Sequence, residues 1–578
     1  MKNMPYLPHL TFLALLVTSP VTGQSVDGLE DRGTLDLRVL KSKPDSAWDA
    51  RAVEHLFNRA GFGAHNLDVR RGLRAGQKML VRQLIRGEDE GPRFVVRPVE
   101  PDMEMLKGGD EEERRKERNR LRNDNRRQGQ EFLNWWVNRM LEGQSPLRER
   151  MTLFWHGFFT SDSTKVRLAE LMIDQNELLR EHALGNFGEL LHAIVRDPAM
   201  LIYLDNTSNT KDSPNENLAR ELMELFSLGE GNYTEEDIRE VARALTGYGI
   251  DRKREFVFNA RAHDFTTKTI LGVEGRHDGR DVVDILLAQP ACARWVAGRI
   301  ITYLEGAAPD QERLEAYAEF LREADYELGP MLEKLLLDPE FYRDEIVGAR
   351  VSSPIDYLVG ACRRLGADVR GELIIRGAGL LGMSLFEPPN VKGWNEGPAW
   401  ITTATLMNRA NLAGVLLGTI GAEEMLVDPL DDMELTEEEM ASMGPEFPLD
   451  EAMMGEGEMM MTSAEVEREK KSRNQGNLMA KVARAIGSGG HHPRISLGAR
   501  LFRSGASSDR EIVEFMCSSL LAIDAPLETR RMLVAALRTD REAQGIEPGA
   551  LVKKTMAAEQ VLRRLAHLIL SLPEAQLG

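Results

Sequence analysis

Apolar residues recur at helical spacing through most of residues 132–246, and this periodicity constrains the fold more than any other feature of the chain. Side chains three and four positions apart lie on one face of an α-helix. The pattern predicts helices over 168–182, 187–196, 215–228 and 235–246. Thr234 is followed three residues later by Asp237, which is typical of a capped helix start. We therefore expect a mainly α protein, a multi-helix orthogonal bundle.

One stretch departs from the helical pattern. Residues 255–258 and 268–271 are rich in β-forming side chains, and a mostly polar connection separates them. This arrangement predicts one small β-hairpin near 255–271. Its loop carries His263 and Asp264, which we expect to be exposed.

The N-terminus has the pattern of a secretion signal. Lys2 precedes a mostly apolar run of twelve residues from Leu10 to Val21, and small residues follow up to Gly23. Twelve helical residues span only ~18 Å, which is too short for a bilayer core of about 30 Å. The sequence thus predicts an exported protein, periplasmic or extracellular, that is cleaved near Gly23 and has no membrane span.

The acidity of the chain is local. The net charge is −19, but residues 423–469 contain 17 acidic residues and one basic residue, so this stretch accounts for about 16 of the negative charges. Its like charges and scarce aliphatic residues predict a disordered, Met-rich insert over 421–475. The nearly neutral remainder lacks the basic face that nucleic-acid binding requires.

These features divide the chain into six expected regions. They are a signal peptide (1–23), a flexible leader (24–47), an N-terminal helical region with a charged segment (48–130), the main helical domain (131–420), the acidic insert (421–475) and a C-terminal helical region (476–578). Cys292, Cys362 and Cys517 are too few and too scattered for a disulfide framework, although one pair remains possible.

Several motifs resemble a known family, the one catalogued as domain of unknown function 1800. They occur in family order at 55–63 (HLFNRAGFG), 155–156 (WH), 179–187 (LREHALGNF), 197–206 (DPAMLIYLDN), 215–226 (NENLARELMELF), 231–235 (GNYTE) and 388–394 (PPNVKGW). Asn395 and Glu396 stand where the family pattern continues with Pro-Gly. The resemblance implies an exported bacterial protein and brings no established activity.

The helix predicted to begin at Asn215 is the first candidate site. Asn217, Arg220, Glu221 and Glu224 fall on one face, opposite a leucine-rich face. Two carboxylates one turn apart can act as a general acid/base pair or hold a cation. The same residues fit an ordinary solvent face with an Arg220–Glu224 pair, and this interpretation is favoured for the helix taken alone. Nearby amides, Asn206 and Asn215, suit turns first and ligand contacts second.

Histidines supply a second candidate. His263 and Asp264 could provide proton transfer or metal binding together with the carboxylates. No His-x-x-x-His or His-Glu-x-x-His spacing occurs, so the fold would have to assemble any metal site, and whether a metal binds is open.

A third candidate is the loop 388–394, in which Lys392 and Trp394 follow two prolines. Trp394 can serve as a stacking platform, or it can pin the loop to the helical body.

Nucleotide-binding and serine-hydrolase motifs are missing from the sequence, so no nucleotide cofactor is expected. Two functions remain. One is a binding or assembly module whose polar cleft takes an exported protein or polymer. The other is a hydrolase-like enzyme that acts on an exported polymer through Glu221, Glu224, His263 and Asp264.

Overall fold

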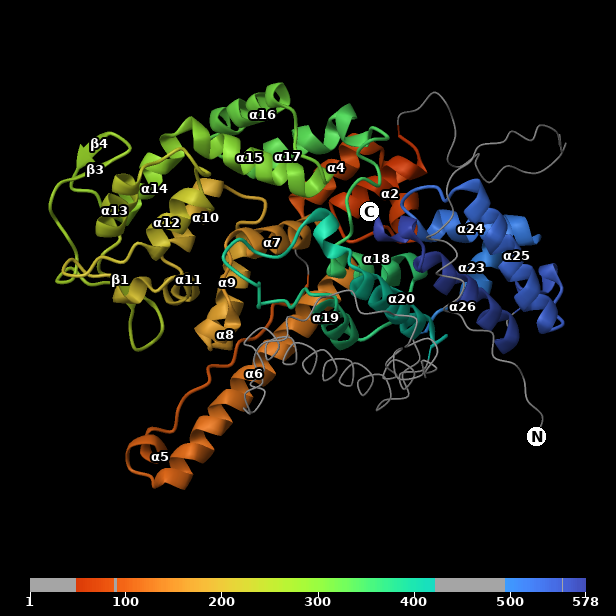
Figure 1. Ribbon diagram of the computed structural model, residues 1–578, viewed down its shortest axis with the longest axis horizontal. Coiled ribbons are helices and arrows are strands. Elements are labelled where there is room, and N and C mark those ends of the chain that lie inside the picture. The colour runs from red at the N-terminus through yellow and green to blue at the C-terminus, as the bar shows by residue number, and fades with distance from the viewer. Residues whose placement is uncertain (1–47, 88–90, 421–493, 554) are drawn as a thin grey trace, which may run out of the picture. The chain divides into compact units, whose positions relative to one another are not determined.

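The computed structural model describes residues 48–87, 91–420, 494–553 and 555–578, and they form a mainly α fold, as predicted (Figure 1). The first helices are α2 (Ala50–Arg59), α3 (Asn66–Ala75), α4 (Gln77–Arg86), α5 (Met103–Lys107), α6 (Glu111–Glu142), α7 (Pro146–Phe158), α8 (Ser163–Val166), α9 (Ala169–Glu181), α10 (Phe187–Ile194), α11 (Pro198–Tyr203), α12 (Asn217–Glu224) and α13 (Glu235–Ala244). The later ones are α14 (Gly279–Ala288), α15 (Pro290–Glu305), α16 (Gln311–Glu323), α17 (Leu328–Leu337), α18 (Pro354–Leu365), α19 (Gly371–Leu380), α20 (Thr403–Leu417), α23 (Leu497–Ser504), α24 (Asp509–Leu520), α25 (Leu527–Ala543) and α26 (Met556–Leu570).

Short 3₁₀ helices occur between these elements. They are η2 (Asn206–Ser208), η3 (Pro339–Tyr342), η4 (Gly397–Trp400), η6 (Pro548–Ala550) and η7 (Pro573–Gln576). The signal, the leader and the acidic insert that the sequence predicts lie outside the described residues. No helix in the described part of the chain combines the length and the apolar character that crossing a bilayer requires.

Local sequence explains where several helices begin and end. The capping box predicted at α13 is present, because the Thr234 side chain accepts from the Asp237 amide and Asp237 accepts from the Thr234 amide. Residues 66–86 form two helices instead of one continuous helix. Gly76, with φ of 75°, ends α3 and starts α4, since this backbone conformation cannot continue a helix.

The β structure differs from the predicted hairpin. β2 (Phe256–Phe258) and β3 (Lys268–Ile270) fall within the expected segments, but they do not pair with each other. β2 pairs antiparallel with β1 (Tyr248–Ile250), and β3 pairs with β4 (Val273–Gly275). The prediction of one hairpin is therefore wrong: the described residues contain two, each closed by a shorter connection than the one expected.

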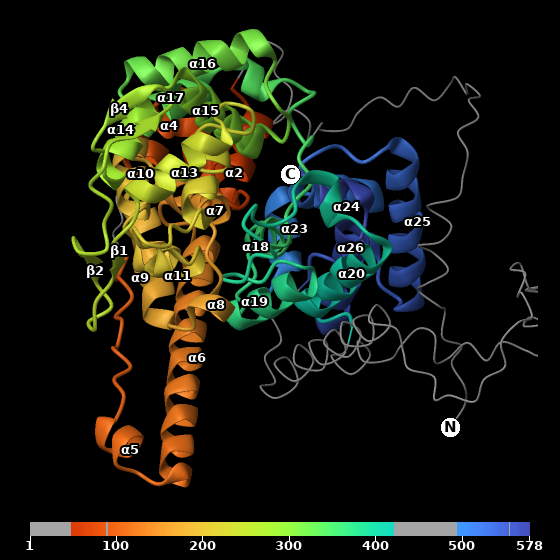
Figure 2. The ribbon, with the colours of Figure 1, turned by 60° about the vertical axis from the view of Figure 1, so that its left-hand side comes forward.

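The charged segment after residue 110 forms the first half of α6. Asp110 caps the helix and makes a reciprocal pair with Glu113. α5 packs against this end of α6 (Figure 2). Arg120 of α6 also donates to the carbonyl of Glu100, in the segment before α5. Glu117 accepts from Arg120 and from the Asp102 amide, so even this polar segment is held by specific bonds.

Buried apolar side chains form three clusters. The largest includes the aromatic side chains of Trp155, Phe159 and Phe187, whose rings stack against one another. The second lies around α6, α18 and α19, and the third around α24 and α26. All three cysteines are buried and free, and burial raises the pKa of each thiol to about 12. They therefore act as small apolar side chains.

A buried carboxylate joins α6, α7 and α9. Glu149 is fully buried and accepts from the indole of Trp136 (2.9 Å) and from Nε of Arg139 (2.6 Å). Arg180 of α9 donates to both of its oxygens at 3.1–3.4 Å. Trp135 covers both guanidinium groups at 4.8–5.2 Å from its ring centre. One carboxylate thus satisfies charged groups from two other helices.

We expect Glu149→Gln to lower the free energy of unfolding by about 3–5 kcal/mol, because it removes the fully buried carboxylate that Arg139 and Arg180 share. Urea unfolding monitored by circular dichroism would measure the change. Glu177→Gln is the matched control. It removes the more exposed partner of Arg180 and is expected to cost less than about 1 kcal/mol. Equal losses in the two variants would contradict the importance assigned to Glu149.

Candidate functional site

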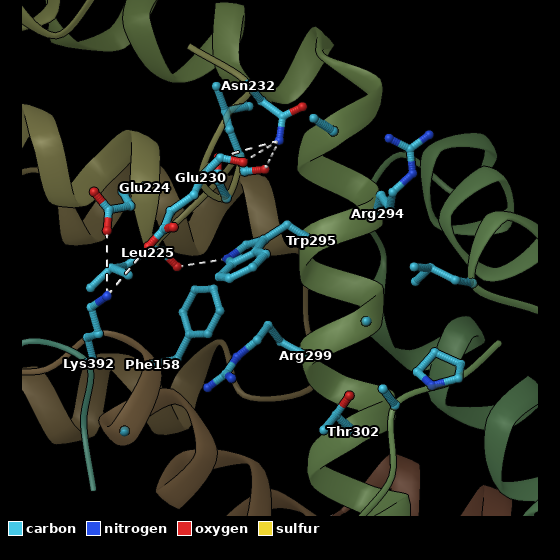
Figure 3. A pocket seen from close by; sticks show the side chains of 18 of the residues that line it. Phe158, Glu224, Leu225, Glu230, Asn232, Arg294, Trp295, Arg299, Thr302 and Lys392 are labelled. Atoms are coloured by element: carbon cyan, nitrogen blue, oxygen red, sulfur yellow. Dashed lines mark hydrogen bonds and ion pairs between the residues drawn. The ribbon is translucent and has the colours of Figure 1, made fainter. Parts of the chain in front are cut away.

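A cavity of about 600 Å³ lies between the C-terminal end of α12, the segment after it, and α15 (Figure 3). Its apolar wall comprises Phe158, Leu225, Leu228, Trp295 and Leu314. Charged and polar side chains also line it, namely Glu224, Glu230, Asn232, Arg294, Arg299, Thr302 and Lys392. The cleft is more apolar than the polar cleft predicted from sequence.

The segment 225–232 is shaped around Trp295. The indole nitrogen donates to the Leu225 carbonyl at 2.8 Å. Gly229, with φ of 78°, lies against the ring, and a Cβ there would come within 2.8 Å of it. Asn232 donates to the Leu228 carbonyl at 3.0 Å and closes the turn. These contacts within the chain fix one wall of the cavity.

α15 forms the other wall by presenting one face. Four residues at intervals of three and four positions line the cavity, namely Ala291, Trp295, Gly298 and Thr302. Arg294 and Arg299 lie beside them. Arg294 is held by Glu315 at 2.7 Å and Arg299 by Glu396 at 3.0 Å. Both guanidinium groups are therefore oriented, and both remain partly exposed.

Glu224, Glu230 and Lys392 form the charged edge. The Lys392 ammonium lies 3.7 Å from Glu224 and 3.6 Å from Glu230. Tyr233 donates to Glu224 at 3.0 Å, and burial together with this bond raises the pKa of Tyr233 to about 12. The structure thus brings together two predicted residues, Glu224 and Lys392, from distant parts of the chain.

Glu221 lies one turn before Glu224 and is half-buried. Burial and then the neighbouring Glu224 raise its pKa, whereas Lys392 lowers it. A carboxyl with a raised pKa beside a second carboxylate is an arrangement used for general acid catalysis. It also occurs at purely structural positions.

The loop that carries Lys392 is pinned to the helical body. Thr160 donates to the Val391 carbonyl at 2.6 Å, and Gly393 approaches the backbone of Gly157. Trp394 packs against the ring of His156, with 5.2 Å between ring centres. Trp394 therefore holds the loop in place instead of offering an open platform. His156 is buried, and this burial lowers its pKa to about 3.

The predicted amide residues contact the chain itself. Buried Asn206 donates to the carbonyls of Leu245 and Tyr248, both at 3.3 Å. Asn215 accepts from the Asn217 amide at 2.9 Å, and Asn217 donates to Asp205 at 3.2 Å. These bonds shape the turn before α12 and leave none of the three residues in the cavity lining.

Arg220 also has a different partner from the expected one. It forms a bidentate pair with Glu235, both distances being 2.9 Å, and a further bond with Glu216. Its predicted pairing with Glu224 is wrong, because Glu224 lies toward Lys392 and Tyr233.

His263 is buried, so the expectation of an exposed histidine is wrong. Its Nδ1 donates to the Thr246 carbonyl at 2.8 Å, and Phe258 and Phe265 pack against the ring. Asp264 accepts from Arg243 at 2.8 Å. Although burial acts to raise the pKa of Asp264, hydrogen bonds from Thr266 and Arg243 lower it well below its usual value. Neither residue lines the cavity.

Sequence reasoning missed Trp295, Arg294, Arg299 and Glu230. The first three of these residues could have been found from the sequence of α15. Small residues alternate there at helical spacing with Trp295 and the two arginines. Within the described parts of the chain, no three histidine, cysteine, aspartate or glutamate side chains are grouped so as to hold a metal ion.

The titration of Glu221 has a predictable effect on stability. Because its pKa is raised in the folded protein, ionising it costs free energy, so its unfavourable contribution grows as pH rises above about 4.5. Glu221→Gln should therefore gain stability relative to the native chain as the pH rises from 4 to 7, by less than about 1 kcal/mol because the half-exposed carboxyl is screened by solvent. Lys392→Met should steepen the dependence. Chemical unfolding across this pH range measures both, and a flat difference would contradict the assignment.

Comparison with known proteins supports the motif resemblance. The family model described as "Protein of unknown function (DUF1800)" matches residues 55–577. No curated protein and no solved structure gives a match. The matched range covers nearly the whole chain, and the chain therefore belongs to the DUF1800 family.

Proposed function

We propose that the protein is an exported binding or assembly module, and that the cavity between α12 and α15 is its binding cleft. The observation that carries this proposal is the combination of a preformed apolar wall and a charged edge in one cavity of about 600 Å³. Ligand sites are typically concave and mostly apolar, with a few oriented polar groups. Export is inferred from the N-terminal signal pattern.

The chemistry of the cleft indicates the kind of ligand. Trp295 and Phe158 suit an apolar or aromatic group, while Lys392 and Glu230 suit a polar group of either charge at the edge. An exported protein segment or polymer that carries both kinds of group fits this arrangement. The charged groups are already paired with one another, so a ligand gains affinity mainly from the apolar wall and orientation from the edge.

A cavity-filling variant tests the proposal. Ala291→Trp places a large side chain on the cavity face of α15, and we expect it to reduce ligand retention at least tenfold. The assay is affinity selection from mixed libraries of short peptides and oligosaccharides, read by mass spectrometry. Ala316→Trp is the matched control, because Ala316 is an exposed helical alanine outside the cavity lining. If both variants retain the same compounds equally, the binding site lies outside this cavity. If the native protein retains no compound, the proposal is refuted.

A hydrolase is the second candidate, favoured by Glu224 in the cavity lining and by Glu221 one helical turn before it. If it holds, retained compounds would be recovered cleaved from the native protein and intact from Glu224→Gln. Recovery of intact compounds from both would support binding alone. The sequence suggested His263 and Asp264 as partners in this chemistry. They do not line the cavity, so we assign them no role in it.

A further inference from the structure

Three arginines and one aspartate from α2, α7, α18 and the segment before α18 are buried together, and none of them lines the cleft. This buried arginine cluster consists of Arg59, Arg150, Arg350 and Asp356. Arg59 is fully buried, Arg150 is 1% exposed and Arg350 is 8% exposed. Guanidinium groups remain protonated in proteins, so the cluster carries three positive charges and one negative charge.

Asp356 serves two of the arginines. Its oxygens lie 2.5 Å from Arg150 and 2.7 Å from Arg350. These two arginines hold the pKa of Asp356 at about 2 despite the opposing effect of burial. Arg150 also donates to the Gly61 carbonyl, and Arg350 to the Tyr303 carbonyl.

Arg59 has no carboxylate of its own among the contacts of the described residues. Its Nη2 donates to the Ile346 carbonyl at 2.6 Å, while its buried Nε and Nη1 have no acceptor. The buried Nε of Arg350 also has none. The nearby Glu305 is already engaged by both terminal nitrogens of Arg313 at 2.7 Å. Burial, followed by repulsion from Arg350, lowers the pKa of Arg59 well below its usual value.

Buried charge is strongly unfavourable unless it is paired, and buried N–H groups need acceptors. Water could satisfy the N–H groups, but it would leave the excess positive charge in place. A negatively charged acceptor would satisfy both requirements. The cluster therefore has the composition of an anion site.

We propose that the buried arginine cluster binds a small inorganic anion between Arg59 and Arg350, and that this anion stabilises the folded chain. The site is independent of the proposed cleft. It would act as a structural ion site that joins helix α2 to the segment before α18.

Chloride is the probe for the test. The thermal midpoint of the purified full chain is measured while chloride replaces gluconate at constant ionic strength, and ³⁵Cl NMR line width reports binding directly. We expect the midpoint to rise by several degrees up to 300 mM chloride, with saturable line broadening, because an anion that binds only the folded state stabilises it.

Two variants locate the effect. Arg59→Gln removes one charge, and His55→Glu supplies a carboxylate beside Arg59 on the same helix. Both should abolish the chloride response, and His55→Glu keeps the test decisive if Arg59→Gln does not fold. Arg51→Gln, an exposed position on α2, should keep it.

A chloride-independent midpoint and line width in the native protein would overturn the proposal and leave water as the occupant. An unchanged chloride response in the folded variants would assign the effect to other sites and overturn it as well.

Discussion

The carboxylate of Glu149 connects the helices on which the rest of the structure depends. It neutralises Arg139 of α6 and Arg180 of α9 from its own place on α7, and Trp136 donates a further bond. A buried charge of this kind requires each partner in one position, because a displaced arginine would remain buried and unpaired. The three helices are therefore held in one relative arrangement. The apolar clusters then pack around this arrangement.

The candidate cleft is a consequence of that framework. α7 begins with the residues around Glu149 and ends at Phe158, which lines the cavity. His156 of the same helix packs on Trp394, and Thr160 just beyond it binds the Val391 carbonyl. These contacts place Lys392 beside Glu224. The polar edge of the cavity therefore depends on a helix whose other end is fixed by a buried ion pair.

The two buried charge clusters contrast in how they are balanced. Glu149 has two arginine partners, Arg139 and Arg180, and both donate hydrogen bonds to its carboxylate. At the buried arginine cluster, by contrast, Asp356 engages two arginines and Arg59 donates only to a backbone carbonyl. The proposed anion would neutralise the excess positive charge there. The requirement that buried charge be paired thus explains the contacts of Glu149 and leads to the proposed anion at the buried arginine cluster.

Helical periodicity predicted the fold class and most helices, because side-chain spacing within one segment records which face is buried. It did not predict the break at Gly76, which depends on backbone conformation, or the pairing of β2 with β1, which depends on the shorter connection available. The amphipathic face of α12 identified Glu224, but its partners Tyr233 and Lys392 are set by tertiary packing. His263 was misjudged for the same reason: Thr246 and the flanking phenylalanines bury it.

Hydrogen exchange with and without a compound selected by the native protein tests the central claim that the framework holds a preformed binding cleft. If the cleft is preformed, binding should slow amide hydrogen exchange in residues 225–232 and in the N-terminal half of α15. Exchange in α24 to α26 should be unchanged. Protection confined to other segments, or widespread ordering of α7 and α9 on binding, would contradict it.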